Sequence, residues 1–256
     1  MKKVIRITAW ITVIAVLGVL VGFINREQKN RDCKAIEVTF ESSDDPQFLD
    51  EQNIIDLLIQ KYDSIEGRKL SEIDLETIER DLNDHPLIAG ADVYTTLKGE
   101  LKINLVQKKP LLRIIPQKGK SWYLDREGTS VPPVAGKPVR TLVASGYIET
   151  PYIDTLRLKN NDNFPVINDL YKLALYINQN RFLKAQIEQI YVNDKGEYEL
   201  VPKVGRQIII FGDLNDMEAK FDKLIAFYEK GIGKSGWSAY KTINLKYRDQ
   251  IVCARR

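Results

Sequence analysis

The sequence predicts an α+β protein with three parts: an N-terminal transmembrane helix, a β-α-α-β-β domain at 33–109 and a β-rich mixed domain at 110–256 that ends in an edge strand. Three observations support this prediction. Residues 7–24 carry no charged side chain. Apolar residues then recur at strand spacing and next at helix spacing as far as Pro110. Beyond that proline, short β-prone runs alternate with turn-forming residues.

The uncharged N-terminal run is long enough to cross a bilayer. Residues 7–24 are rich in Ile, Val, Leu and Ala, and with residues 4–6 they form a helix of roughly 31 Å, close to the hydrocarbon thickness. A cleavable signal peptide is the alternative, but its apolar core usually has about 7–15 residues. No small-x-small cleavage site follows the run. We therefore expect an uncleaved anchor, preceded by a short cytoplasmic tail at 1–6.

The distribution of charge bears on orientation and on partners. Lys2, Lys3 and Arg6 account for the whole formal net charge of +3, so the rest of the chain is neutral. Basic residues flank the apolar run on both sides, but long domains translocate largely regardless of local charge. We expect the N-terminus in the cytoplasm and the large C-terminal part on the outer side of the membrane, in a periplasm-like space. A neutral domain is a poor partner for nucleic acid, so we expect no nucleic-acid binding.

In the first domain, the apolar spacing changes from period two to helical and back. Asp74 is a good N-cap for the second helix, and Pro86 ends it. The expected elements are strands at 35–40, 88–94 and 101–106 and helices at 50–62 and between Asp74 and Pro86. Two amphipathic helices need an apolar sheet face to cover, and three strands supply one.

The second domain is richer in strand candidates. Its expected strands lie at 111–115, 121–124, 140–144, 187–192, 198–201, 207–211, 242–247 and 250–254. A helix is expected at 168–180, with Asn168 as its cap, and another at about 216–230. The turn at 194–196 predicts a hairpin. The final strand is a natural sheet edge, and an edge exposes unpaired backbone groups that invite another chain to add a strand.

The inventory of reactive residues indicates no enzyme. His85 is the only histidine, so the chain cannot build a His-rich zinc site, and no serine elbow, P-loop or dinucleotide glycine pattern is present. We expect no catalytic residue, cofactor, metal or small-molecule substrate. Cys33 and Cys253 lie at opposite ends of the soluble region. They are either two unpaired thiols or a bridge between the first and last strands.

Several short motifs occur in a specific order. They are Leu70-x-x-Ile73-Asp74, His85-Pro86-Leu87-Ile88, Ala91-Asp92-Val93-Tyr94, Gly99-x-Leu101-x-Ile103, Val106-Gln107-Lys108-Lys109-Pro110, Trp122-Tyr123-Leu124-Asp125-x-x-Gly128 and Tyr240-x-x-Ile243-Asn244-Leu245-Lys246-Tyr247. With the preceding apolar segment, this order resembles the FtsQ/DivIB family of bacterial division proteins over nearly the whole chain.

The resemblance implies a POTRA domain followed by the β domain of the family, and a protein without catalytic activity. It also implies a scaffold at the division septum that recruits FtsB/FtsL-like division proteins, among other divisome membrane proteins, through its last strands. The expected partner-binding residues are Leu245, Tyr247, Arg248, Gln250, Ile251, Val252 and Ala254. This chain departs from the family in its very short cytoplasmic tail and in the Asp249-Gln250 turn, where a glycine is common.

Three points remain open: the face of the last strand that contacts the partner, and two other functions. Either Ile251 and Cys253, or Gln250 and Val252, join Tyr247 in facing the partner. A POTRA-type chaperone for envelope proteins would instead bind its clients along a sheet edge at 101–106. An envelope hydrolase would need a pair of carboxylates in a cleft.

Overall fold

The computed structural model describes residues 10, 12, 14–17, 31–41, 48–134, 138–154, 156–158, 162–232, 236 and 239–256. Among these described residues, no helix has the length and apolar composition needed to cross a membrane. The predicted transmembrane helix at 7–24 and the predicted tail at 1–6 fall mostly outside the described residues. The described chain divides into two compact units, the first with 31–41 and 49–107 and the second with Phe48 and 108–256.

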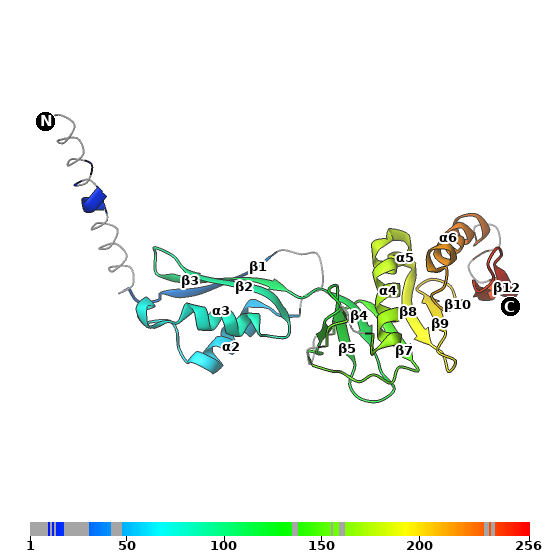
Figure 1. The fold of residues 1–256 in the computed structure, drawn as a ribbon, viewed down its shortest axis with the longest axis horizontal. Helices are drawn as coiled ribbons and strands as arrows, with labels where there is room; N and C mark the ends of the chain where they lie inside the picture. Colours follow the sequence, from blue (N-terminus) through cyan, green and yellow to red (C-terminus); the bar gives the residue numbers. More distant parts are fainter. Residues whose placement is uncertain are drawn as a thin grey trace. The chain divides into compact units, whose positions relative to one another are not determined.

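The first unit is a three-stranded sheet with two helices on one face (Figure 1). Its elements are β1 (Ala35–Phe40), α2 (Glu51–Tyr62), the 3-10 turn η1 (Leu70–Glu72), α3 (Leu75–Asn83), β2 (Ile88–Thr95) and β3 (Glu100–Gln107). The strand order is β1-β3-β2, with β1 parallel and β2 antiparallel to β3. The predicted β-α-α-β-β order is confirmed.

The two helices begin at the acidic caps that their sequences supply. The Asp50 side chain accepts a hydrogen bond from the backbone N–H of Asn53, whose own side chain accepts one from Asp50 N–H, which completes a capping box. Asp74 accepts from Thr77 N–H in the same way, so its predicted role as a cap is confirmed. Each cap satisfies an N–H group that has no partner inside the helix.

The position of β3 excludes one of the predicted binding modes. Because β3 lies between β1 and β2, both of its backbone edges are occupied by ladder hydrogen bonds. The expectation of a client-binding sheet edge at 101–106 is therefore wrong. Leu101, Ile103 and Leu105 are buried under the helices instead, which explains why this segment alternates so regularly in the sequence.

The second unit is built on a mixed sheet of nine strands in the order β12-β11-β10-β9-β8-β7-β4-β5-β6. Its elements are β4 (Pro110–Ile114), β5 (Trp122–Asp125), β6 (Ser130–Val131), β7 (Leu142–Gly146), α4 (Pro165–Gln179), α5 (Arg181–Gln186), β8 (Ile187–Val192), β9 (Tyr198–Pro202), β10 (Ile208–Gly212), α6 (Met217–Phe227), the π-helical turn η2 (Tyr228–Ile232), β11 (Tyr240–Asn244) and β12 (Val252–Arg255).

Two crossover connections determine where the helices of this unit lie. Helices α4 and α5 connect β7 to the parallel strand β8, and α6 connects β10 to the parallel strand β11. Both connections advance in the same direction across the sheet, and such crossovers are almost always right-handed. The helices must therefore cover the same face. Phe221 of α6 shows the result, because its ring packs 4.8 Å from Phe211 of β10 and 4.7 Å from Tyr176 of α4.

The structure corrects the predicted start of the helix at 168–180. Helix α4 begins at Pro165, and Phe164 precedes it without a side-chain cap, so Asn168 lies inside the first turns rather than at the cap. Proline suits the first helical position because its fixed φ matches the helix and its missing N–H would have had no partner. Helix α5, which is capped by the Asn180 side chain, was not predicted from the sequence.

Both terminal strands are shorter than predicted. β11 ends at Asn244 rather than at Tyr247, and β12 begins at Val252 rather than at Gln250. The apolar alternation continues beyond Asn244, but the backbone carbonyl groups there turn toward a lysine side chain instead of the neighbouring strand. Side-chain alternation alone therefore overestimated the length of the strand pair.

A buried carboxyl group at the end of β5 makes the stability of this unit depend on pH. Asp125 is only 2% exposed, and its Oδ1 accepts hydrogen bonds from Glu127 N–H at 3.0 Å and Thr129 N–H at 2.7 Å. Burial raises the pKa of Asp125 to about 6, although the two N–H groups act in the opposite direction. The folded chain therefore binds this proton more tightly than the unfolded chain, whose pKa is about 3.9.

We predict that Asp125→Asn is more stable than the wild type at pH 7.5, because asparagine keeps the acceptor oxygen and cannot ionise. The wild-type contribution of this group to stability rises as pH falls from about 7 to about 4, and the variant lacks that rise. Denaturant unfolding of the full chain at pH 5 and pH 7.5 measures both effects. Asp194→Asn, in an exposed turn, is the matched control. An unchanged pH dependence in Asp125→Asn would contradict this account.

Candidate functional site

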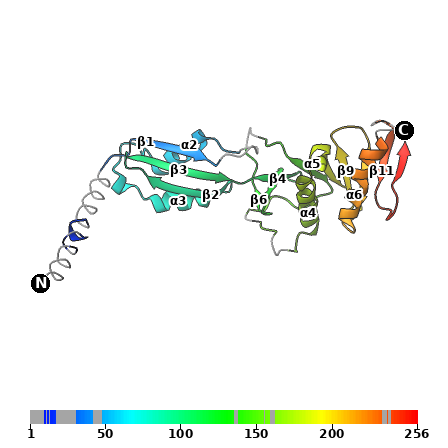
Figure 2. The ribbon, with the colours of Figure 1, turned by 90° about the horizontal axis from the view of Figure 1, so that it is seen from above.

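The C-terminal strand β12 lies at one edge of the nine-stranded sheet and pairs with β11 on one side only (Figure 2). Its register aligns Asn244 with Val252 and Ile243 with Cys253. Ile243 is fully buried among the core side chains, so Cys253 faces the core and Val252 faces away from it. Among the residues that the structure describes, no strand pairs with the backbone edge of β12 that points away from β11.

The predicted partner-binding residues separate into two groups. Tyr247, Arg248, Gln250, Val252 and Ala254 are exposed, and the exposed fractions of Tyr247 and Val252 are 49% and 43%. These five side chains are accessible to a partner.

Leu245 and Ile251 behave differently. Leu245 is fully buried in the core, and Ile251 is half-buried against the core together with Cys253. Of the two alternating faces that the sequence left open, the face with Gln250 and Val252 is therefore the accessible one. Leu245 supports the edge from beneath and has no exposed side chain for a partner to contact.

A lysine on α6 holds the connection between β11 and β12. Lys223 Nζ donates hydrogen bonds to the backbone carbonyl groups of Leu245 at 3.2 Å, of Arg248 at 3.1 Å and of Tyr247. An ammonium group has three N–H donors, so these three carbonyl oxygens use its full capacity. We call this arrangement the Lys223 clamp. It fixes the chain on the approach to β12 without using any side chain of that connection.

The far end of β12 is held by the last residue. Arg256 N–H donates to the backbone carbonyl of Ala239 at 3.2 Å, and the Arg256 guanidinium donates to the carbonyl of Arg206 at 2.8 Å. Between these attachments, β12 has a ladder of only four residues, interrupted by a bulge between Tyr240 and Thr242. The edge strand is therefore short, and contacts at both ends keep it in place.

An ion pair lies beside the clamp. Lys246 Nζ pairs with a carboxylate oxygen of Glu197, which lowers the pKa of Glu197 and raises that of Lys246. Gly212 has φ +80°, and a Cβ there would lie 2.8 Å from Lys246 Cγ, so glycine gives the lysine stem its path across β10. The charge of the Lys246 ammonium is therefore already paired with a carboxylate of the same chain.

The sequence pattern did not identify Lys223 or Glu197 as parts of the site. Lys223 is one of 38 basic residues, and its partners are backbone atoms, which carry no residue-specific signal. The one available hint is its helical spacing from Phe227, four residues later and half-buried against the core, which places the lysine at the margin of the buried face.

The described residues offer little for metal or thiol chemistry. They contain no group of three or more His, Cys, Asp or Glu side chains arranged to hold a metal ion. His85 Nδ1 accepts a hydrogen bond from Leu87 N–H at a helix end. Cys33 and Cys253 are free thiols, and burial raises the pKa of both.

Comparison with known proteins agrees with this architecture. The model of a family described as FtsQ/DivIB, C-terminal related matches residues 109–254, and a model of a POTRA-like domain matches residues 31–106. A relative named cell division protein FtsQ, from Rhodothermus marinus, is 26% identical over 190 residues, which cover 73% of this chain and 67% of the relative. The chain belongs to the FtsQ/DivIB-related family and carries a POTRA-like domain ahead of the C-terminal region that this family model matches.

Proposed function

We propose that this protein is a non-enzymatic cell-division scaffold that recruits an FtsB/FtsL-like partner to the septum by strand addition at β12. Family membership implies the role in cell division, and the proteins of this family are generally not enzymes. The proposal places the scaffold in the inner membrane, anchored by residues 7–24 with residues 1–6 in the cytoplasm. A POTRA-like domain at 33–109 and a β domain at 110–256 would then lie in the periplasm.

The observation that carries this proposal is the free edge of β12. An edge strand presents unpaired N–H and C=O groups that an extended segment of another chain can pair with. Such edges promote aggregation, and proteins commonly block them with charged residues or cover them. Here the edge stays uncovered within the described residues, while the Lys223 clamp and Arg256 hold its two ends. A prearranged edge loses less conformational entropy when it binds.

Side chains beside the edge would set the specificity for the partner. Main-chain hydrogen bonds are common to all strand partners, so discrimination depends on alternate side chains. Val252 and Ala254 offer a small apolar surface next to the added strand, and Tyr247 adds an aromatic ring at one end. Arg248 is exposed at the rim, where a charge changes the rate of association more than the affinity.

We predict that Val252→Asp weakens binding of the periplasmic part of an FtsB-like protein from the same source by about tenfold or more, which corresponds to roughly 1.4 kcal/mol. The carboxylate would be desolvated beside the added strand. Surface plasmon resonance with the full-length chain measures the dissociation constant. Val204→Asp is the matched control, because Val204 is 51% exposed and Val252 is 43% exposed. Equal affinities for the two variants would argue against docking at β12.

We predict that Lys223→Met weakens the same interaction by roughly threefold to tenfold. Without the clamp, the connection between β11 and β12 must become ordered when the partner binds, and this lowers the affinity. Methionine keeps the apolar stem and removes the three donors. Lys230→Met, at an exposed position in the next helical segment, is the control. Thermal unfolding of both variants shows whether the core is intact. A Lys223→Met chain with wild-type affinity would mean that the clamp does not prepare the edge.

A further inference from the structure

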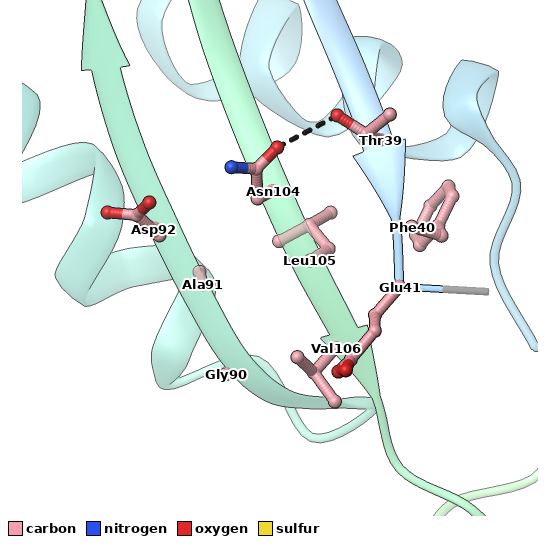
Figure 3. A pocket seen from close by; sticks show the side chains of 9 residues that line it. All are labelled: Thr39, Phe40, Glu41, Gly90, Ala91, Asp92, Asn104, Leu105 and Val106. Atoms are coloured by element: carbon pink, nitrogen blue, oxygen red, sulfur yellow. Dashed lines mark hydrogen bonds between the residues drawn. The ribbon is translucent and has the colours of Figure 1, made fainter. Parts of the chain in front are cut away.

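The face of the three-stranded sheet that points away from α2 and α3 carries a second candidate surface. Thr39, Asn104 and Asp92 align across β1, β3 and β2 in the ladder register. The row alongside it, in which Val38, Ile103 and Val93 align, is buried under the helices. Side chains alternate between the two faces of a strand, so the row with Asn104 faces outward. Figure 3 shows these outward residues from close by.

This outward face is hollowed at one end of the sheet. Gly90 lies opposite Val106 in the register and has no side chain to fill the space beside it. A Cβ added at Gly90 would first meet the Val106 side chain, at 4.0 Å. The resulting hollow has a volume of about 550 Å³, and the described residues that line it come from β1, β2, β3 and the adjoining Glu41. No residue of α2 or α3 lines it.

The hollow combines an apolar floor with a negatively charged rim. Val106, Gly90 and the backbone of β3 form the floor, and Glu41 and Asp92 stand on opposite sides of β3 (Figure 3). No lysine or arginine is among the described residues that line the hollow. Lys102, which faces outward farther along β3, is paired with Glu37 at 3.0 Å. The two rim carboxylates are exposed, and no ion pair is found for either among the described residues.

We propose that this hollow is a docking site for a cationic amphipathic helix of a partner protein. Three strands spaced about 4.8 Å apart span roughly 10 Å, which matches the diameter of one α-helix. A small apolar ridge of that helix packs on Val106 in the space left by Gly90. Lysine or arginine side chains beside the ridge pair with Glu41 and Asp92.

Two other kinds of occupant fit the observations less well. An added strand would pair with the backbone edge of β1 or β2 and would not fill a hollow over the central strand β3. An anionic membrane surface would be repelled by Glu41 and Asp92. The inference is independent of strand addition at β12, because it uses residues of the first unit only.

The test uses a fluorescent 18-residue helical peptide with a ridge of leucine and alanine flanked by lysines, and the purified full-length chain. We expect saturable binding that weakens as salt rises. Gly90→Leu fills the hollow without backbone strain, because Gly90 does not have a positive φ, and should weaken binding at least tenfold. Ala35→Leu, on the same outward face but outside the hollow, is the control.

A second variant removes charge at exposed positions and therefore spares the fold. Glu41→Gln with Asp92→Asn should weaken peptide binding and reduce its salt dependence, whereas Glu72→Gln with Glu76→Gln should leave both unchanged. Val252→Asp should also bind the peptide normally, which separates this site from β12. The proposal is overturned if the peptide does not bind up to millimolar concentration, or if Gly90→Leu and the double variant bind it like the wild type. Equal binding of a peptide with glutamate in place of lysine would also overturn it.

Discussion

The handedness of the two crossover connections is the constraint on which the second unit depends. Because β7 to β8 and β10 to β11 both advance toward the same edge, right-handed crossovers place all the helices on one face. A single core then forms between that face and the helices. Strands β11 and β12 follow α6 in the chain and are the outermost strands at that end of the sheet. The chain end becomes a sheet edge, and α6 lies close enough to hold it.

Helix α6 packs in the core and also contacts the connection between β11 and β12. Its Phe221 packs in the core between Phe211 and Tyr176, while Lys223, two residues later, reaches the carbonyl groups of the β11–β12 connection. The helix that completes the core therefore also orders the approach to the edge strand. A short strand with a bulge gains little from its own ladder, so its order depends on these contacts from outside the sheet.

Much of the fold could be predicted from the sequence because its signals are local. The cap at Asp74 and the alternation at 101–106 depend only on neighbouring residues in the chain. They correctly predict α3 and β3. The order of strands in the second sheet depends on pairings far apart in sequence, and no single-sequence pattern reports them. The Asn168 cap was wrong because Pro165 three residues earlier already starts the helix.

The candidate site was predicted only in outline. The terminal strand was predicted, and the alternation of its residues showed which side chains share a face. The alternation could not show which of the two faces is buried. Leu245 follows the same alternation as Tyr247 and yet lies in the core. The Lys223 clamp was not predicted because its lysine side chain donates hydrogen bonds to three backbone oxygens rather than to a side chain of the connection. Such contacts depend on the folded path of the chain and leave no trace in residue types.

Hydrogen–deuterium exchange of the full-length chain, alone and with the FtsB-like partner bound, tests the central claim most directly. Strand addition should slow exchange of the backbone amides of β12, at 252–255, because their free edge gains hydrogen-bond partners. Amides in the central strands β8 and β9 should change little. Slower exchange elsewhere, with the β12 amides unchanged in the bound state, would contradict the account and place the partner on another surface.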